Sequence, residues 1–148
     1  MAVKINTYFY LSHRIISFNH IEIMTSLELA KDWLSLRNIE YEYDEHMDVV
    51  RIQIPEGKVA IYTIPEYNLF CISHSEAMIA SELSERERMA IISVMQDTAF
   101  VRPVPREDRK RIKFKIVVCQ QPDDVCGWID KSIEDLSKGI KIFRNKMA

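Results

Sequence analysis

From Met24 onward, the spacing of hydrophobic and polar positions switches several times between the period typical of helices and the period typical of strands. These changes indicate a helix, three strands, a second helix, two strands and a long final helix. We therefore expect an α+β fold in which an antiparallel sheet of about five strands carries its helices on one face. The pattern contains no catalytic or ligand-binding motif, so the order of elements is the main evidence for function.

The first helix is expected to begin near Thr25, because Thr25 and Glu28 have the spacing of a capping box. Asn38 is suited to end the helix in a left-handed conformation. The apolar stripe between them consists of Leu27, Ala30, Trp33 and Leu34. The acidic segment 40–45 that follows is interpreted as a solvated extended link.

Three strands are predicted next, over 50–54, 59–64 and 69–72, where apolar and polar residues alternate. Short turns at 55–58 and 65–68 contain proline, and the first also contains glycine. Because short turns join neighbouring antiparallel strands, the three strands should form a meander.

A second helix is expected after Ser84, which has capping-box spacing with Glu87. Its apolar side is assigned to Leu83, Met89, Ile92, Val94 and Met95. Residues 98–104 then read as extended, since the prolines at 103 and 105 prevent helix continuation. Residues 112–118 alternate as a half-buried strand does.

The last helix is expected to begin at Asp123, a good N-cap residue. Its apolar residues step by four and three and form a heptad seam: Ile129, Ile133, Leu136, Ile140, Phe143 and Met147. The seam is expected to pack on the protein's own sheet. Trp128, Ile140, Ile142 and Phe143 together offer more apolar surface than one sheet contact needs, so they are the candidate interface of a homodimer or another protein partner.

The bulk properties fit one domain of ordinary globular composition over residues 24–148, with 47% hydrophobic and 28% charged residues in the chain. Residues 1–23 are an N-terminal extension or an extra strand. The net charge of −2 argues against a general nucleic-acid binder. Three cysteines, no signal-peptide pattern and no long apolar window lead us to expect a cytoplasmic protein without a membrane span.

The order of elements resembles the YbjN-like proteins, which are similar in structure to type III secretion chaperones. The resemblance rests on the helix, acidic link and strand over 29–54, the hairpin turns PEGK and PEYN, the SERER helix start and the long closing helix. It spans roughly residues 24–147. It implies a protein that acts by binding other proteins, often as a dimer, with no shared catalytic residues.

A basic strand is the sharpest surface feature, because Arg111, Lys113 and Lys115 alternate with apolar residues and so share one sheet face. These three residues are candidate anion-binding residues, and further cations precede them from residue 102 on. A phosphate-tracking surface is one interpretation. We favour a solvated outer face whose charge is offset by Glu107, Asp108 and the acidic segment 40–45.

Metal and catalytic sites have little support. Cys71, His74, Cys119 and Cys126 match no common zinc spacing, and the first two should point to opposite faces of one strand. The carboxylates near residues 42–48 are interpreted as part of the solvated link, not as an acid and base pair. We therefore expect no metal, no cofactor and no enzymatic activity.

The favoured function is a chaperone-like or adaptor module that binds protein. The alternative is a nucleic-acid or anionic-ligand binder that uses residues 106–115.

Overall fold

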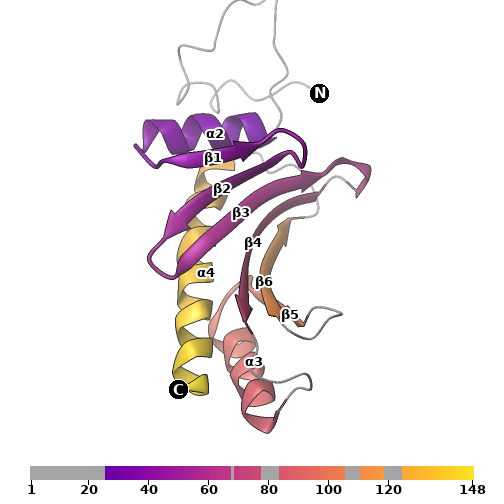
Figure 1. Cartoon of the computed structure of the whole chain (residues 1–148), viewed down its shortest axis with the longest axis vertical. Coiled ribbons are helices and arrows are strands. Elements are labelled where there is room, and N and C mark those ends of the chain that lie inside the picture. Colours follow the sequence, from indigo (N-terminus) through magenta and orange to yellow (C-terminus); the bar gives the residue numbers. More distant parts are fainter. Residues whose placement is uncertain (1–25, 68, 78–83, 106–110, 119–124) are drawn as a thin grey trace, which may run out of the picture.

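The computed structural model describes residues 26–67, 69–77, 84–105, 111–118 and 125–148 (Figure 1). Within them lie three α-helices: α2 (Ser26–Leu36), α3 (Glu85–Asp97) and α4 (Val125–Met147). The strands are β1 (Tyr41–Asp44), β2 (Val49–Ile54), β3 (Gly57–Ile64), β4 (Leu69–Ala77), β5 (Arg102–Pro105) and β6 (Arg111–Val118), with a short 3₁₀ turn, η2 (Pro65–Tyr67), after β3. The predicted α+β fold class is confirmed. The predictions for residues 1–23, for the capping box at Thr25 and for the cap at Asp123 fall outside the described residues.

The strands form one sheet in the order β1-β2-β3-β4-β6-β5, and every neighbouring pair is antiparallel. The meander β2–β3–β4 is as predicted. After β4 the chain passes through α3 and β5 before β6 returns to pair with β4. β5 is thereby left at one edge, where its two prolines are tolerated because no further strand needs their backbone N–H groups.

The described sheet has one strand more than the sequence predicted. β1 lies in the acidic segment that we interpreted as a link, and it pairs with β2 in the register Tyr41↔Ile52. Charged residues dominate this segment, but its two tyrosines alternate with them and lie on the face of the sheet that carries the core. Tyr41 is half-buried and packs against the core. The alternation of Tyr41 and Tyr43 was the signal for a strand.

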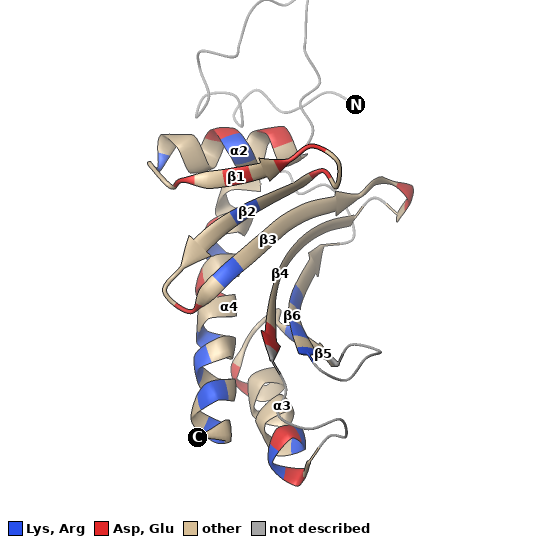
Figure 2. Cartoon of the chain, in the orientation of Figure 1, with Lys and Arg blue, Asp and Glu red and all other residues tan. Residues whose placement is uncertain are grey.

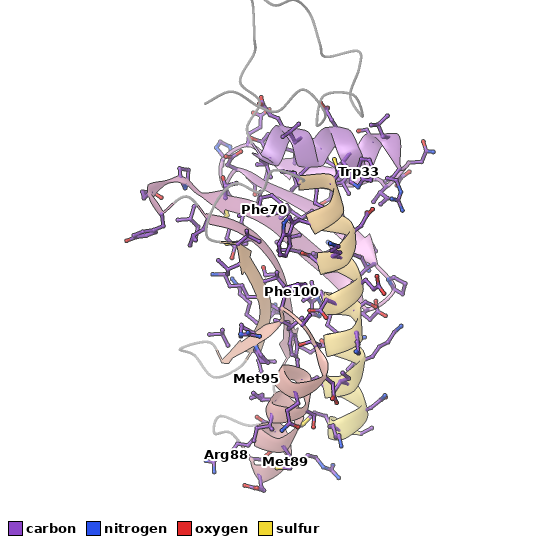
Figure 3. The ribbon with its side chains drawn as sticks, turned by 180° about the vertical axis from the view of Figure 1, so that it is seen from behind. Trp33, Phe70, Arg88, Met89, Met95 and Phe100 are labelled. Atoms are coloured by element: carbon purple, nitrogen blue, oxygen red, sulfur yellow. The ribbon has the colours of Figure 1, made fainter. Side chains whose placement is uncertain are left out.

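The sheet has one face covered by helices and one open face. Figure 3, which views the molecule from behind, shows α4 running across the covered face. The covered face carries large buried side chains from the four central strands: Val50, Ile52, Val59, Ile61, Phe70, Ile72, Ile112, Phe114 and Ile116. The central residue of this layer, Phe114, makes an edge-to-face contact with Phe143 of α4, with ring centroids 5.2 Å apart.

α4 buries most of its predicted seam within the chain itself. Ile140 is fully buried and Phe143 is 4% exposed, so these two side chains do not supply the surplus surface that we expected of a dimer interface. The reason is that α4 packs against α3, α2 and the sheet together, so more than a single stripe of the helix is covered. Ile142 packs at the margin of the core, and Trp128 is half-buried with its ring against Phe100, 5.1 Å between centroids.

α3 packs on α4 with a face that buries Glu87, Ala90 and Val94. Ala90 and Val94 are fully buried, and a Cβ placed on Gly139 of α4 would lie 3.3 Å from Cγ1 of Val94. The two helices therefore approach closely. The assignment of the apolar side of this helix is wrong for Met89, Ile92 and Met95, which are exposed because the helix turns the face of Glu87, Ala90 and Val94 toward the rest of the molecule. Leu83 lies outside the described residues.

A polar network fastens the β2–β3 turn to α4. Arg144 donates to both carboxylate oxygens of Glu76 and to the carbonyl oxygen of Glu56. Lys141 forms an ion pair with Glu56 at 3.2 Å. His74 extends the network: its Nε2 lies 3.3 Å from a carboxylate oxygen of Glu76, and its Nδ1 lies 2.7 Å from the carbonyl oxygen of Lys58.

The network lowers the pKa of both of its carboxyl groups. Burial by itself raises the pKa of Glu76, but hydrogen bonds from Arg144 and His74 outweigh it and hold the pKa below its ordinary value. At Glu56, a hydrogen bond from Ser137 contributes most to the lowered pKa, with Lys141 adding to it against the effect of burial. Both carboxylates therefore stay ionised at neutral pH and keep the turn on the helix.

Candidate functional site

The three basic-strand residues lie together on the open face of the sheet, as their period-2 spacing predicts. Arg111 is exposed, and Lys113 and Lys115 are half-buried. The same face of β2 and β3 carries Arg51 and Lys58. Figure 2 shows these cations as blue segments on β2, β3 and β6. The fold thus brings together cations from three strands that the sequence keeps up to 64 residues apart.

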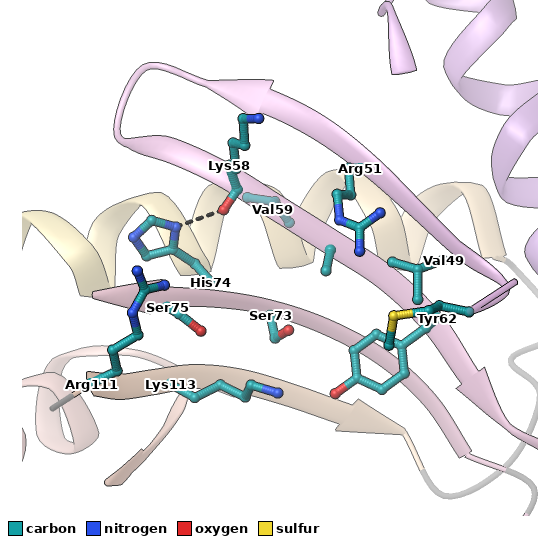
Figure 4. Close-up of a pocket in the computed structure, with 12 residues that line it drawn as sticks. Val49, Arg51, Lys58, Val59, Tyr62, Ser73, His74, Ser75, Arg111 and Lys113 are labelled. Atoms are coloured by element: carbon teal, nitrogen blue, oxygen red, sulfur yellow. Dashed lines mark hydrogen bonds between the residues drawn. The ribbon is translucent and has the colours of Figure 1, made fainter. Parts of the chain in front are cut away.

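Between these cations the open face is hollowed into a trough of about 620 Å³. Its floor is made of small residues, Ala60 on β3 with Ser73 and Ser75 on β4 (Figure 4). Lys58 and Arg51 line one side, and Lys113 and Arg111 line the other. No described helix covers this face. We call this hollow the basic trough.

Tyr62 closes one end of the basic trough. The ammonium groups of Lys113 and Lys115 lie 5.8 and 5.9 Å from the centroid of its ring. This cation–π arrangement holds both lysines over one aromatic ring. Cys71, the cross-strand neighbour of Tyr62, is fully buried, and burial raises the pKa of its thiol. Cys71 is therefore a packed thiol and not an activated nucleophile.

The three described residues of the cysteine and histidine set, Cys71, His74 and Cys126, form no metal-holding group. Cys71 and His74 are on opposite sides of β4, as their spacing predicts. Cys126 is buried in α4, and Cys119 lies outside the described residues. Among the residues that the structure describes, no group of three or more His, Cys, Asp or Glu side chains is placed to hold a metal ion.

The acidic segment holds the β1–β2 turn. One oxygen of Asp44 accepts from the backbone N–H groups of His46 and Met47, each at 3.1 Å. The other oxygen pairs with Arg51 at 3.3 Å. The Tyr43 hydroxyl donates to Asp48, which raises the pKa of Tyr43 to about 12. Asp44 and Asp48 thus have local structural partners that stabilise the turn.

A second surface lies on α3, where Met89, Ile92 and Met95 are 51%, 44% and 49% exposed. Their spacing of three residues places them along one side of the helix, away from the buried Ala90 and Val94. Figure 3 shows Met89 and Met95 projecting outward from α3. We call these three residues the α3 stripe. The sequence reveals that they are apolar but not that the opposite face of the helix makes the core contact.

Comparison with known proteins finds matches in structure only. No family model and no curated protein matches the sequence. The fold is similar to that of YbjN, a putative transcription regulator from E. coli, with a TM-score of 0.60 and 11% identity over 80% of this chain and 90% of that one. It is also similar to the Yersinia pestis type III secretion chaperone SycH, crystallised with a stable fragment of YscM2. That match has a TM-score of 0.55 and 11% identity over 80% of this chain and 99% of SycH.

The chain has the fold of YbjN and SycH. The resemblance drawn from the order of elements is therefore confirmed at the level of fold. At 11% identity the likeness carries no residue roles. No helix in the described part of the chain is long and apolar enough to span a membrane.

Proposed function

We propose that this protein is a non-enzymatic protein-binding module, of a chaperone-like or adaptor kind, that works as a homodimer in the cytoplasm. Its fold supports the proposal, since SycH, which shares that fold, was crystallised with a fragment of another protein. The observation that carries it is the α3 stripe. Exposed apolar side chains in a row are typical of protein interfaces.

The α3 stripe is suited to contact a second copy of itself. The sequence Met-x-x-Ile-x-x-Met reads the same in both directions. Around a twofold axis at Ile92, Met89 of one copy meets Met95 of the other and the two isoleucines meet at the centre. Such an isologous contact needs one self-complementary patch. Methionine adapts well to such packing because its side chain is unbranched and flexible.

Flanking charges do not oppose this pairing. In the antiparallel arrangement Arg88 of one copy lies opposite Gln96 of the other, so no like charges face each other at that position. The contact with α4 on the far side of α3 stays intact. The dimer thus uses the face of α3 that the monomer leaves exposed, and it leaves the open sheet face available for another protein.

Co-purification tests the proposal. A tagged chain is expressed with a differently tagged copy in the source cell and captured with and without nuclease treatment. We expect the second copy and at least one other polypeptide to be recovered after nuclease. The variant Met89→Lys/Met95→Lys should lose the second copy. Recovery of nothing but nuclease-sensitive material contradicts a protein-binding role.

A matched control keeps the test specific to α3. The variant Leu36→Lys/Tyr67→Lys also adds two lysines at exposed apolar positions, which are 47% and 74% exposed, but on other elements. It should recover the second copy as the wild type does. Both variants should fold normally, because exposed substitutions change stability by about 0.5 kcal/mol or less. Equal loss in both variants argues against the α3 stripe as the contact.

A further inference from the structure

The basic trough concentrates positive charge that the molecule as a whole does not have. The chain carries a net charge of −2, yet cations line both sides of one hollow. Among the described residues, Arg51 has an ion-pair partner, Asp44, whereas no described carboxylate lies within salt-bridge distance of Lys58, Arg111 or Lys113. Keeping like charges this close without partners is unfavourable in the free protein, so the trough is complementary to a negatively charged ligand.

The shape of the basic trough favours an extended chain. Alternate residues of β6 are about 6.6 Å apart along the strand, since each residue advances about 3.3 Å. An extended peptide presents alternate side chains at the same repeat. Carboxylates at every second position can therefore face Arg111 and Lys113 in turn. The small floor residues Ala60, Ser73 and Ser75 let a backbone approach closely, and the serine hydroxyls can donate to it.

We infer that the basic trough binds a short, extended, acidic segment of a partner polypeptide. The inference rests on the proposed protein-binding function and names the chemistry of the partner. The charges of Lys58 on one side and of Arg111 and Lys113 on the other, which have no described carboxylate partner, receive the carboxylates of the segment. The ring of Tyr62 closes one end of the trough.

A polypeptide fits better than a nucleic acid for two reasons. Two rings line the trough: His74 is only 6% exposed and stacks with Phe114, and Lys113 and Lys115 already lie over Tyr62, so bases have no free stacking platform. Beyond Arg51 the sheet continues into β1, whose Glu42 and Asp44 follow that same face. A long polyanion would meet these carboxylates, whereas a segment of a few residues ends before them.

Fluorescence anisotropy with a labelled ten-residue peptide of alternating Glu and Ser tests the inference on the full chain. The wild type should bind this peptide, more tightly at low salt because exposed charges are screened by ions. A Gln–Ser peptide of equal length should not bind. The variant Lys58→Glu/Lys113→Glu should weaken binding about tenfold or more, since it replaces an attraction by a repulsion on each side of the trough.

Two further variants keep the test decisive. Lys131→Glu/Lys138→Glu changes net charge by the same amount at exposed positions of α4, and it should bind the peptide as the wild type does. Lys58→Gln/Lys113→Gln should also weaken binding, and it replaces the Glu variant if that protein does not fold. Undiminished binding in both trough variants, or no binding by the wild type, overturns the inference.

A ten-residue oligothymidylate serves as the competing probe. If it binds more tightly than the acidic peptide, the trough belongs to nucleic acid and the polypeptide assignment is wrong. The outcome is separable from that of the proposed function. If the wild-type chain does not bind the peptide but still co-purifies with its second copy, only the inference about the trough is wrong. If the chain is monomeric and captures no other protein, the proposed function is wrong, whether or not the peptide binds.

Discussion

At the scale of single residues, Gly57 holds the β2–β3 turn in a conformation that other residues rarely adopt. Its φ is +142°, and a Cβ at this position would lie 2.8 Å from Cε1 of His74. We expect Gly57→Ala to destabilise the protein by about 1–3 kcal/mol, because both the backbone and the His74 ring must adjust. Urea denaturation followed by circular dichroism measures the change.

The His74→Ala background separates the two causes at Gly57. Without the ring, Gly57→Ala should lower the free energy of unfolding less than it does in the wild type, because the backbone term alone remains. An equal loss in both backgrounds would show that the ring contributes nothing to the requirement for glycine.

The Glu76–Arg144 ion pair makes stability depend on pH. The pKa of Glu76 in the folded protein is lower than its ordinary value of 4.5. A lowered folded pKa gives a stabilisation that is fully present above the ordinary value and is lost as the pH falls through the folded pKa. We expect Glu76→Gln to be less stable than the wild type at pH 7, with the difference shrinking at pH 3. A difference that stays constant between these two urea titrations contradicts this role.

At the scale of elements, period and capping predicted most of the fold. Ser84 caps α3 as expected by accepting from the Glu87 N–H at 3.1 Å, and Asn38 ends α2 with a positive φ of 56°. β1 was missed because its charges were weighed above the alternation of its tyrosines. Local pattern also could not reveal which side of α3 meets α4, since both sides carry apolar residues and the choice depends on Gly139, more than 40 positions away.

Gly139 shows how a local preference gives way to packing. In an isolated helix glycine costs about 1 kcal/mol relative to alanine. Here it lets α3 approach, with Val94, Thr98 and Val101 side chains 3.3–3.5 Å from the position of a Cβ. We expect Gly139→Val to destabilise the protein by about 1–3 kcal/mol through overpacking. Thermal melting checks this, and an unchanged or higher melting temperature would show that the two helices are not held this closely.

At the scale of the whole molecule, the sequence predicted parts of each candidate surface but not their assembly. Period 2 placed Arg111, Lys113 and Lys115 on one face. Arg51 and Lys58 lie opposite these residues because of the registers of β2, β3, β4 and β6. Those registers arise from pairings between distant segments of the chain. The sequence indicated surplus apolar surface on α4, yet Ile140 and Phe143 are buried within the chain, where α4 packs against α3, α2 and the sheet. The surplus lies on α3 instead.

Light scattering on the purified chain is the most direct test of the central claim that this is a protein-binding module joined through the α3 stripe. One chain has a mass of 17.4 kDa. At micromolar concentration we expect the wild type to show about twice that mass, and Met89→Lys/Met95→Lys to show the mass of one chain. A wild-type mass of 17.4 kDa across the whole accessible range, or a doubled mass that survives the α3 substitutions, contradicts the account.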